Sequence, residues 1–304
     1  MFFIPRKAST VPLLEKVAAE LGTRFVGSPK APGKEAVALK PVRIGLWDRH
    51  GGSMPSGWTR WLLERFEFPF QVVYAPELDK GNLRNKFDVL ILVDGAIPGR
   101  GVGALRPGAL SGQPIPEESI PAEYRGRRGG ITTAKTVPQL RKFLESGGTI
   151  LAIGSSTALG TQLGLPLTNH LVAKDEEGKE RPLTRAKFYV PGSVLRVRVD
   201  NANPLAWGVG EEADVLFWAS PTFRLTGGGS ANRVHRVAWF DRKTPLRSGW
   251  AWGQEHLEGG VAIAEARVGK GTLVLFGPEI LFRAQPHGTF KFLFNGIVQA
   301  GVKE

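Results

Sequence analysis

Short apolar runs alternate with amphipathic stretches along much of the chain. The runs at 42–47, 70–74, 87–93 and 149–153 have the length of strands, and the third is apolar enough to be buried on both faces. Between them lie stretches whose apolar residues recur at helical spacing, such as the one that Ser56 can cap. Strands that alternate with helices predict a parallel α/β sheet with right-handed crossovers and helices on both faces.

The pattern changes character between residues 165 and 260. Short strand-like runs with polar alternation lie there at 188–190, 194–199, 215–218 and 234–240. Such alternation is typical of strands, so we predict a β-rich insertion in the α/β domain. Two late strands at 261–266 and 271–277 and a final helix that ends at Gly301 return the chain to the α/β pattern.

Two further segments bear on how the chain is divided. Residues 1–40 are predicted to form a short strand, a helix bounded by Thr10 and Gly22, and a linker, ahead of one α/β domain over 41–304. A chain that opens on such a strand–helix unit is expected to be the tail of a longer one. The Gly/Pro-rich stretch 95–130 is long for a loop, and loops of that length are either functional or mobile.

Composition narrows the class of protein. Of the 304 residues 42% are hydrophobic and 22% charged, which is ordinary for a soluble globular chain and argues against disorder over most of the length. Cysteine is absent, and this excludes disulfides, thiolate metal sites and a cysteine nucleophile. No run of about 18 apolar residues occurs, so no membrane span is predicted.

The net charge of +12 invites a nucleic-acid interpretation, but the distribution of the charge argues against it. The basic residues gather at 124–128 and at 242–247. At 174–181 they alternate with acidic residues, as in a solvated charged loop. Because neither a nucleic-acid-binding motif nor a basic stripe is present, we expect no nucleic-acid partner.

One strand–turn–helix has the shape of a nucleophile elbow. It runs from the strand at 149–153 through Gly154, Ser155 and Ser156, and such a turn projects a side chain at the carboxyl edge of a parallel sheet. Either serine could act as a nucleophile, with His287 as the base and Glu279 as the orienting acid. The alternative is a structural cap, since serine leads the capping preferences.

A second candidate site follows the first strand of the α/β domain. The residues His50, Gly51, Gly52 and Ser53 precede a helix, so backbone N–H groups there could hold an anion. Together with Gly154 they would form a small-ligand site at the carboxyl edge of the sheet. The segment matches no phosphate-binding motif, and turn geometry is the alternative reason for its glycines.

The histidines and tryptophans give weaker evidence of a functional site. None of the five histidines has a partner at metal-ligand spacing apart from His256-Leu257-Glu258, and one pair does not make a zinc site, so no metal is expected. The pairs Trp58/Trp61 and Trp250/Trp252 could form stacking platforms, although core packing is the default for tryptophan. The second pair has strand spacing in a polar context and is expected to be the exposed one.

Four stretches resemble one protein family. They are KPVRIGLWDRHGGSMPSGWTRW at 40–61, 66–74, 87–98 and RAQPHGTF at 283–290. They resemble the C-terminal portion of large bacterial proteins of the M14 zinc carboxypeptidase family, in which the peptidase domain comes first. The tail of those proteins is similar to a class I glutamine-amidotransferase-like domain. The resemblance covers nearly the whole chain and implies a flavodoxin-like fold.

The resemblance brings no catalytic residue with it. The zinc site of that family starts from a His-x-x-Glu pair, and this sequence contains none. Active amidotransferase-like domains place cysteine in the elbow, often as Ala-Ile-Cys-His-Gly. Here Gly154 follows Ala152-Ile153 in the direct register, and a slip of one residue would offer Ser155.

The resemblance therefore implies a non-catalytic accessory or interaction domain that works with an M14 peptidase domain, upstream or in trans. The alternatives are a serine hydrolase that uses Ser155 or Ser156 with His287, and a small-ligand-binding module at the sheet edge. No cofactor is expected. The sequence as it stands has no export signal and predicts the cytoplasm, whereas the full-length proteins that it resembles imply export.

Overall fold

The computed structural model describes residues 3–33, 36–97, 117–226 and 234–302. The chain divides into two compact units, one of residues 1–40 with 302–304 and one of residues 41–301. The stretch predicted as a long insertion, 95–130, lies partly outside the described residues.

The first unit contains one helix, α1 (Thr10–Leu21), none of whose residues is buried. Its C-terminal cap is Gly22 at φ 61°, as predicted. Residues 3–9 form no strand, contrary to expectation. Ser9, not Thr10, is the N-cap residue, because the Thr10 hydroxyl is bonded to Lys7, from whose N–H it accepts at 2.7 Å.

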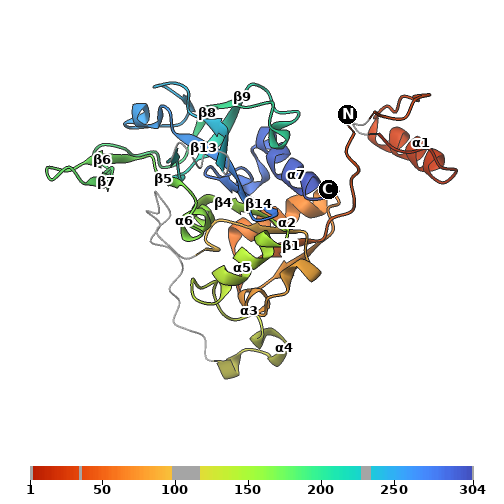
Figure 1. Ribbon diagram of the computed structural model, residues 1–304, viewed down its shortest axis with the longest axis horizontal. Helices are drawn as coiled ribbons and strands as arrows, with labels where there is room; N and C mark the ends of the chain where they lie inside the picture. Colours follow the sequence, from red (N-terminus) through yellow and green to blue (C-terminus); the bar gives the residue numbers. More distant parts are fainter. Residues whose placement is uncertain (1–2, 34–35, 98–116, 227–233, 303–304) are drawn as a thin grey trace. The chain divides into compact units, whose positions relative to one another are not determined.

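The second unit is built on a parallel sheet. Its parallel strands run in the order β2 (Phe70–Val73), β1 (Ile44–Trp47), β3 (Val89–Leu92), β4 (Thr149–Ile153) and β14 (Gly271–Phe276). The chain enters β1 first, pairs it with β2, and then crosses back to β3, which is the flavodoxin-like order. The predicted fold class is confirmed: strands β1, β3 and β4 are buried throughout, as expected of a parallel sheet with helices on both faces (Figure 1).

Helices fill the connections between these strands, and a last helix follows β14. They are α2 (Met54–Arg65), α3 (Ala75–Asp79), α4 (Ala122–Arg125), α5 (Thr136–Glu145), α6 (Ala158–Gln162) and α7 (Phe290–Gln299). Phe66, the C-cap residue of α2, packs on Phe294 of α7 with the ring centroids 4.8 Å apart, while α3 packs against α5. Within the described ranges no helix is long and apolar enough to cross a membrane. Short 3₁₀ turns lie at Leu83–Asn85, Glu117–Ser119, Gly154–Thr157, Pro204–Ala206, Gln254–Leu257, Phe282–Ala284 and His287–Thr289.

The predicted β-rich insertion is confirmed, and it extends the same sheet. Its strands are β5 (Leu167–Asn169), β6 (Val172–Lys174), β7 (Glu180–Pro182), β8 (Ser193–Val199), β9 (Glu212–Phe217), β10 (Phe223–Leu225), β11 (Val234–Trp239) and β12 (Leu246–Ser248). Antiparallel β13 (Val261–Val268) pairs with β14 on one side and with β11 on the other, so the two parts form one 12-stranded sheet.

Residues 175–179 of the charged segment 174–181 form the loop that we expected, and the residues at either end of the segment pair as strands. The segment belongs to a separate two-stranded ribbon of β6 and β7 (Figure 1). The Asp175 carboxylate accepts hydrogen bonds from the N–H groups of Glu177 and Lys179, and Gly178 at φ 77° closes the turn. Turn chemistry therefore folds a segment whose charges remain exposed.

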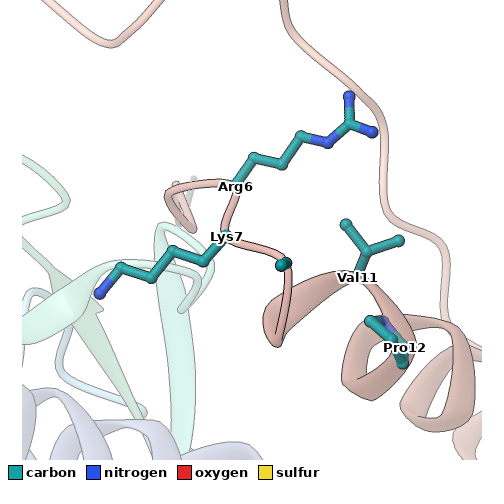
Figure 2. A pocket seen from close by; sticks show the side chains of 5 residues that line it. Arg6, Lys7, Val11 and Pro12 are labelled. Atoms are coloured by element: carbon teal, nitrogen blue, oxygen red, sulfur yellow. The ribbon is translucent and has the colours of Figure 1, made fainter.

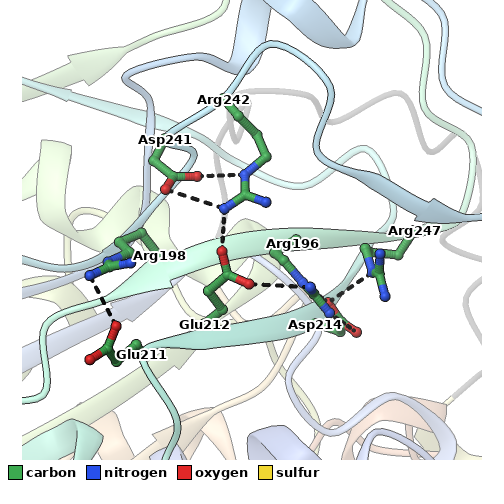
Figure 3. A network of polar contacts seen from close by, with 8 residues as sticks. All are labelled: Arg196, Arg198, Glu211, Glu212, Asp214, Asp241, Arg242 and Arg247. Atoms are coloured by element: carbon green, nitrogen blue, oxygen red, sulfur yellow. Dashed lines mark hydrogen bonds and ion pairs between the residues drawn. The ribbon is translucent and has the colours of Figure 1, made fainter.

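Arg242 and Arg247, the arginines of the basic stretch 242–247, are paired with acidic residues. Figure 3 shows them beside β8 and β9, whose exposed faces carry alternating charges. The ion pairs of this network join Arg196 to Glu212 and Asp214, Arg198 to Glu211, Arg242 to Glu212 and Asp241, and Arg247 to Asp214. Four arginines thus face four carboxylates, and the network offers no basic stripe to a phosphate backbone.

A buried ion pair ties β1 to β3 at the start of the two strands. The side chain of Asp88 is 6% exposed and accepts hydrogen bonds from the backbone N–H and Nε of Arg43, at 2.9 and 3.0 Å, and from Arg84. Burial alone would raise the pKa of Asp88, but the hydrogen bonds from the two arginines outweigh it and hold the pKa well below its ordinary value. The carboxylate is therefore a fixed negative charge in the folded state.

We expect Asp88→Asn to lower the free energy of unfolding by about 2–3 kcal/mol near neutral pH, because it leaves two arginines without their buried partner. A lowered pKa in the folded state gives stability that is complete above the unfolded-state pKa and is lost as the pH falls. Urea unfolding should therefore show that the difference between the two proteins shrinks below about pH 4. Glu180→Gln, in the exposed pair with Arg224, is the control and should cost less. Equal losses in both variants would contradict this account.

Candidate functional site

The candidate site lies at the carboxyl edge of the parallel sheet, where β3, β4 and β14 end. Asp94 comes just after β3, Gly154 just after β4, and Glu279 just after β14. Because the three strands are adjacent and parallel, their ends meet at one edge of the sheet. Asp94 is half-buried, and Gly154 and Glu279 are buried.

Gly154 is the first residue of the turn that follows β4. Its φ is 59°, a conformation that residues with a side chain rarely adopt. A Cβ atom added there would lie 2.6 Å from Asp94 Oδ1 and 2.8 Å from Glu279 Oε1. The space that a nucleophilic side chain would need is therefore taken by two carboxylates, which face each other across the glycine.

Ser155 is bonded into the loop that follows β3. Its hydroxyl donates to Asp94 Oδ1 at 2.6 Å, and its backbone N–H donates to the same oxygen at 2.8 Å. The N–H of Gly95 in turn donates to Ser155 Oγ at 2.9 Å. Asp94 and Ser155 thus close a small ring of hydrogen bonds between the ends of β3 and β4.

Ser156 continues the same connection from a fully buried position. Its hydroxyl donates to Val93 O at 2.5 Å and accepts from the N–H groups of Ala96 and Ile97, at 3.0 and 3.2 Å. All three partners are backbone groups of the loop after β3, and the Ala96 N–H also donates to Val93 O at 3.1 Å. The hydroxyl is a structural link between two loops.

The structure does not join His287 to either serine. His287 is exposed, and its ring lies against Phe290 with the centroids 5.1 Å apart. Within the described part of the chain no hydrogen bond connects it to Ser155 or Ser156. Glu279 is held beside Gly154, and its backbone N–H donates to Leu216 O at 3.1 Å.

The segment from His50 to Ser53 is a turn that starts α2. Gly51 and Gly52 have φ of 83° and 78°, and a Cβ on either would meet no atom within 4 Å, so their backbone conformation is what requires glycine. Ser53, not Ser56 as predicted, caps the helix by accepting the Ser56 N–H at 3.2 Å. The Ser53 hydroxyl therefore serves the helix, and the half-buried His50 stands beside the turn.

An aromatic cluster forms around Phe282, whose backbone N–H donates to Glu279 O at 3.3 Å. The ring of Phe282 meets Trp58 and Trp218 edge-on, with centroid distances of 5.4 and 5.2 Å. The backbone around it is strained, since Ala219, Arg283 and Ala284 all have positive φ. No local pattern in the sequence marks this cluster, because its rings come from three distant parts of the chain. Asp94 could have been found, since it directly follows an apolar strand.

Two other features of the described residues, a surface hollow and the placement of possible metal ligands, add nothing to this site. Figure 2 shows an open hollow beside α1, lined by Arg6, Lys7, Ala8, Val11 and Pro12, all of which belong to the first unit. In the ranges that the structure describes, no group of three or more His, Asp or Glu side chains could hold a metal ion.

Comparisons with known proteins find only distant structural similarities. No protein-family profile and no curated protein match the chain, so the M14 resemblance stays a prediction. Similar solved structures include PurLQS of Thermotoga maritima, at 16% identity over 86% of this chain and 99% of that one, with a TM-score of 0.48. A Bacteroides uniformis protein described as ThuA-like is 9% identical over 90% and 95% of the two chains, with a TM-score of 0.44. At TM-scores below 0.5 these similarities carry no inference about activity.

We expect Gly154→Ala to lower the free energy of unfolding by at least about 3 kcal/mol, because the new methyl group combines left-handed strain with overlap. Gly164→Ala is the matched control: Gly164 has a φ of 73°, and a Cβ there would meet no atom within 4 Å. Backbone strain alone should cost that variant about 1–2 kcal/mol. Urea unfolding of both variants measures the difference. If the two lose the same stability, the carboxylates do not fill the space at the elbow.

Proposed function

We propose that this chain is a non-catalytic accessory domain that works with an M14-type zinc carboxypeptidase. The observation that carries the proposal is the absence of a nucleophilic side chain at Gly154, in the turn after β4. Gly154 supplies no nucleophile, and the side chains of Asp94 and Glu279 take the space beside it. The sequence resemblance at 40–61 and 283–290 suggests which enzyme the domain accompanies.

The serine hydrolase alternative is less well supported. A nucleophilic serine needs a base within hydrogen-bond reach and a free path to substrate. The hydroxyl of Ser156 is fully buried and bonded to three backbone groups, and that of Ser155 is bonded to a carboxylate that also holds its own N–H. Asp94 could accept the Ser155 proton, so this serine is the one that an experiment has to exclude.

We expect no covalent labelling when the purified chain is incubated with a fluorophosphonate probe, since the hydroxyls of Ser155 and Ser156 are both held in hydrogen bonds. Mass spectrometry of the intact protein measures the adduct. The matched control is Ser155→Ala, which should behave identically to the unaltered chain. A stoichiometric adduct that disappears in Ser155→Ala, in a protein that still melts cooperatively, would establish the hydrolase instead.

Mixing the purified chain with an M14 peptidase domain tests the proposed association. The chain should elute together with the M14 peptidase domain encoded beside it in the same genome, and should leave an unrelated zinc carboxypeptidase unbound. Size-exclusion chromatography with light scattering gives the stoichiometry. Separate elution at micromolar concentrations, or a genome in which no M14 reading frame accompanies this one, would contradict the proposal.

A further inference from the structure

Two exposed tryptophans lie two residues apart in the β-rich insertion. Trp250 and Trp252 are 52% and 55% exposed, as the sequence predicted for this pair. Ala251 between them packs against the core, so the two indoles project from the opposite, solvent side of one extended segment. Two residues of extended chain separate ring attachments by about 6.6 Å. The pair therefore forms a short aromatic platform on the surface.

The platform is held rigidly by its backbone. The buried hydroxyl of Ser193 donates to Trp250 O and accepts from Trp250 N–H, at 2.5 and 2.9 Å. A pair of backbone hydrogen bonds of 3.0 Å joins Trp252 to Tyr189. Trp252 Nε1 donates to Ala186 O at 2.8 Å, which fixes the orientation of that indole. A preorganised platform loses little conformational entropy when a ligand stacks on it.

The surroundings of the platform are aromatic and basic. The Tyr189 ring meets Trp250 at 5.8 Å, and the Arg185 guanidinium lies 5.2 Å from the Tyr189 centroid. Arg185 and Lys187 are exposed, and neither has an ion-pair partner among the described residues. The segment 184–193 contains no acidic residue. A ligand that lies on the indoles would therefore meet two uncompensated positive charges.

We propose that Trp250 and Trp252 form a binding platform for an acidic polysaccharide, one whose sugar rings carry carboxylates. The electron-rich face of an indole attracts the positively polarised C–H bonds of a sugar ring. Arg185 and Lys187 would pair with the carboxylates of the same chain. This site goes beyond the accessory role proposed above and does not depend on a peptidase partner.

The observations favour a glycan over other macromolecules. A protein partner would be met by a contiguous apolar patch, but in the segments 184–193 and 246–258 the two indoles are the only exposed large hydrophobic side chains. A nucleic acid would need a track of cations along its phosphates. The segment 184–193 offers only Arg185 and Lys187, which are too few cations for such a track.

Binding to an array of uronate-containing and neutral oligosaccharides, with single-stranded oligothymidylate as a competitor class, tests the proposal on this chain alone. We expect the uronate oligosaccharides to bind most tightly, and Trp250→Ala and Trp252→Ala each to weaken them at least about tenfold by calorimetry. The double variant Arg185→Gln/Lys187→Gln should weaken acidic oligosaccharides and leave the binding of neutral ones unchanged.

Trp61→Ala is the matched control, because Trp61 is 55% exposed on α2 and should not matter. If an alanine variant fails to fold, Trp250→Phe keeps a ring and should retain part of the affinity. No uronate binding, tighter binding of the oligothymidylate, or an equal loss in Trp61→Ala would overturn the proposal. Because no peptidase is present in this experiment, its failure would leave the proposed association with the enzyme untouched.

Discussion

The carboxylate of Asp94 organises the edge of the sheet on which the functional argument rests. One of its oxygens accepts both the hydroxyl and the backbone N–H of Ser155, and this joins the ends of β3 and β4. The same oxygen stands where a side chain on Gly154 would have to be. The hydrogen bonds that close the turn therefore also exclude a nucleophile from it. A carboxylate that accepts several N–H and O–H donors is among the stronger polar links available to a fold.

Ser156 completes this arrangement on the buried side. Its hydroxyl forms hydrogen bonds with three backbone groups of the loop after β3. That loop begins where the strand ends, so the sheet no longer supplies its hydrogen bonds. Turn and loop are consequently parts of one hydrogen-bonded unit. A hydroxyl in that role has no lone pair or proton left for chemistry without breaking the unit, and breaking it would cost the buried loop three hydrogen bonds.

Much of the fold could be predicted from the sequence, because hydrophobic periodicity decides it. The runs at 87–93 and 149–153 became β3 and β4, and polar alternation after residue 165 marked the inserted strands. Predictions that depended on single hydrogen bonds were less secure. Ser56 and Thr10 are plausible caps by residue type, but Ser53 and Ser9 take those positions, because the choice between neighbouring polar residues is made by backbone geometry.

The site was predictable only in part, for the same physical reason. Placement at the carboxyl edge follows from topology, so Gly154, Ser155 and Glu279 were found. The contacts among these side chains were not predictable, since they depend on the conformation of each loop. His287 packs on Phe290, while Asp94 is hydrogen-bonded to Ser155. The cluster of Trp58, Trp218 and Phe282 depends on contacts between segments far apart in sequence. No local pattern encodes such contacts.

Amide hydrogen exchange tests the central claim most directly, because the claim is that the serine hydroxyls and the Asp94 carboxylate are occupied by backbone N–H groups. The account predicts that the N–H groups of Ala96, Ile97 and Ser155 exchange slowly, with protection approaching that of the strand amides of β3 and β4. Exchange of these amides at the rate of an open loop would contradict the account, because the hydroxyls of the two serines would then be free to react.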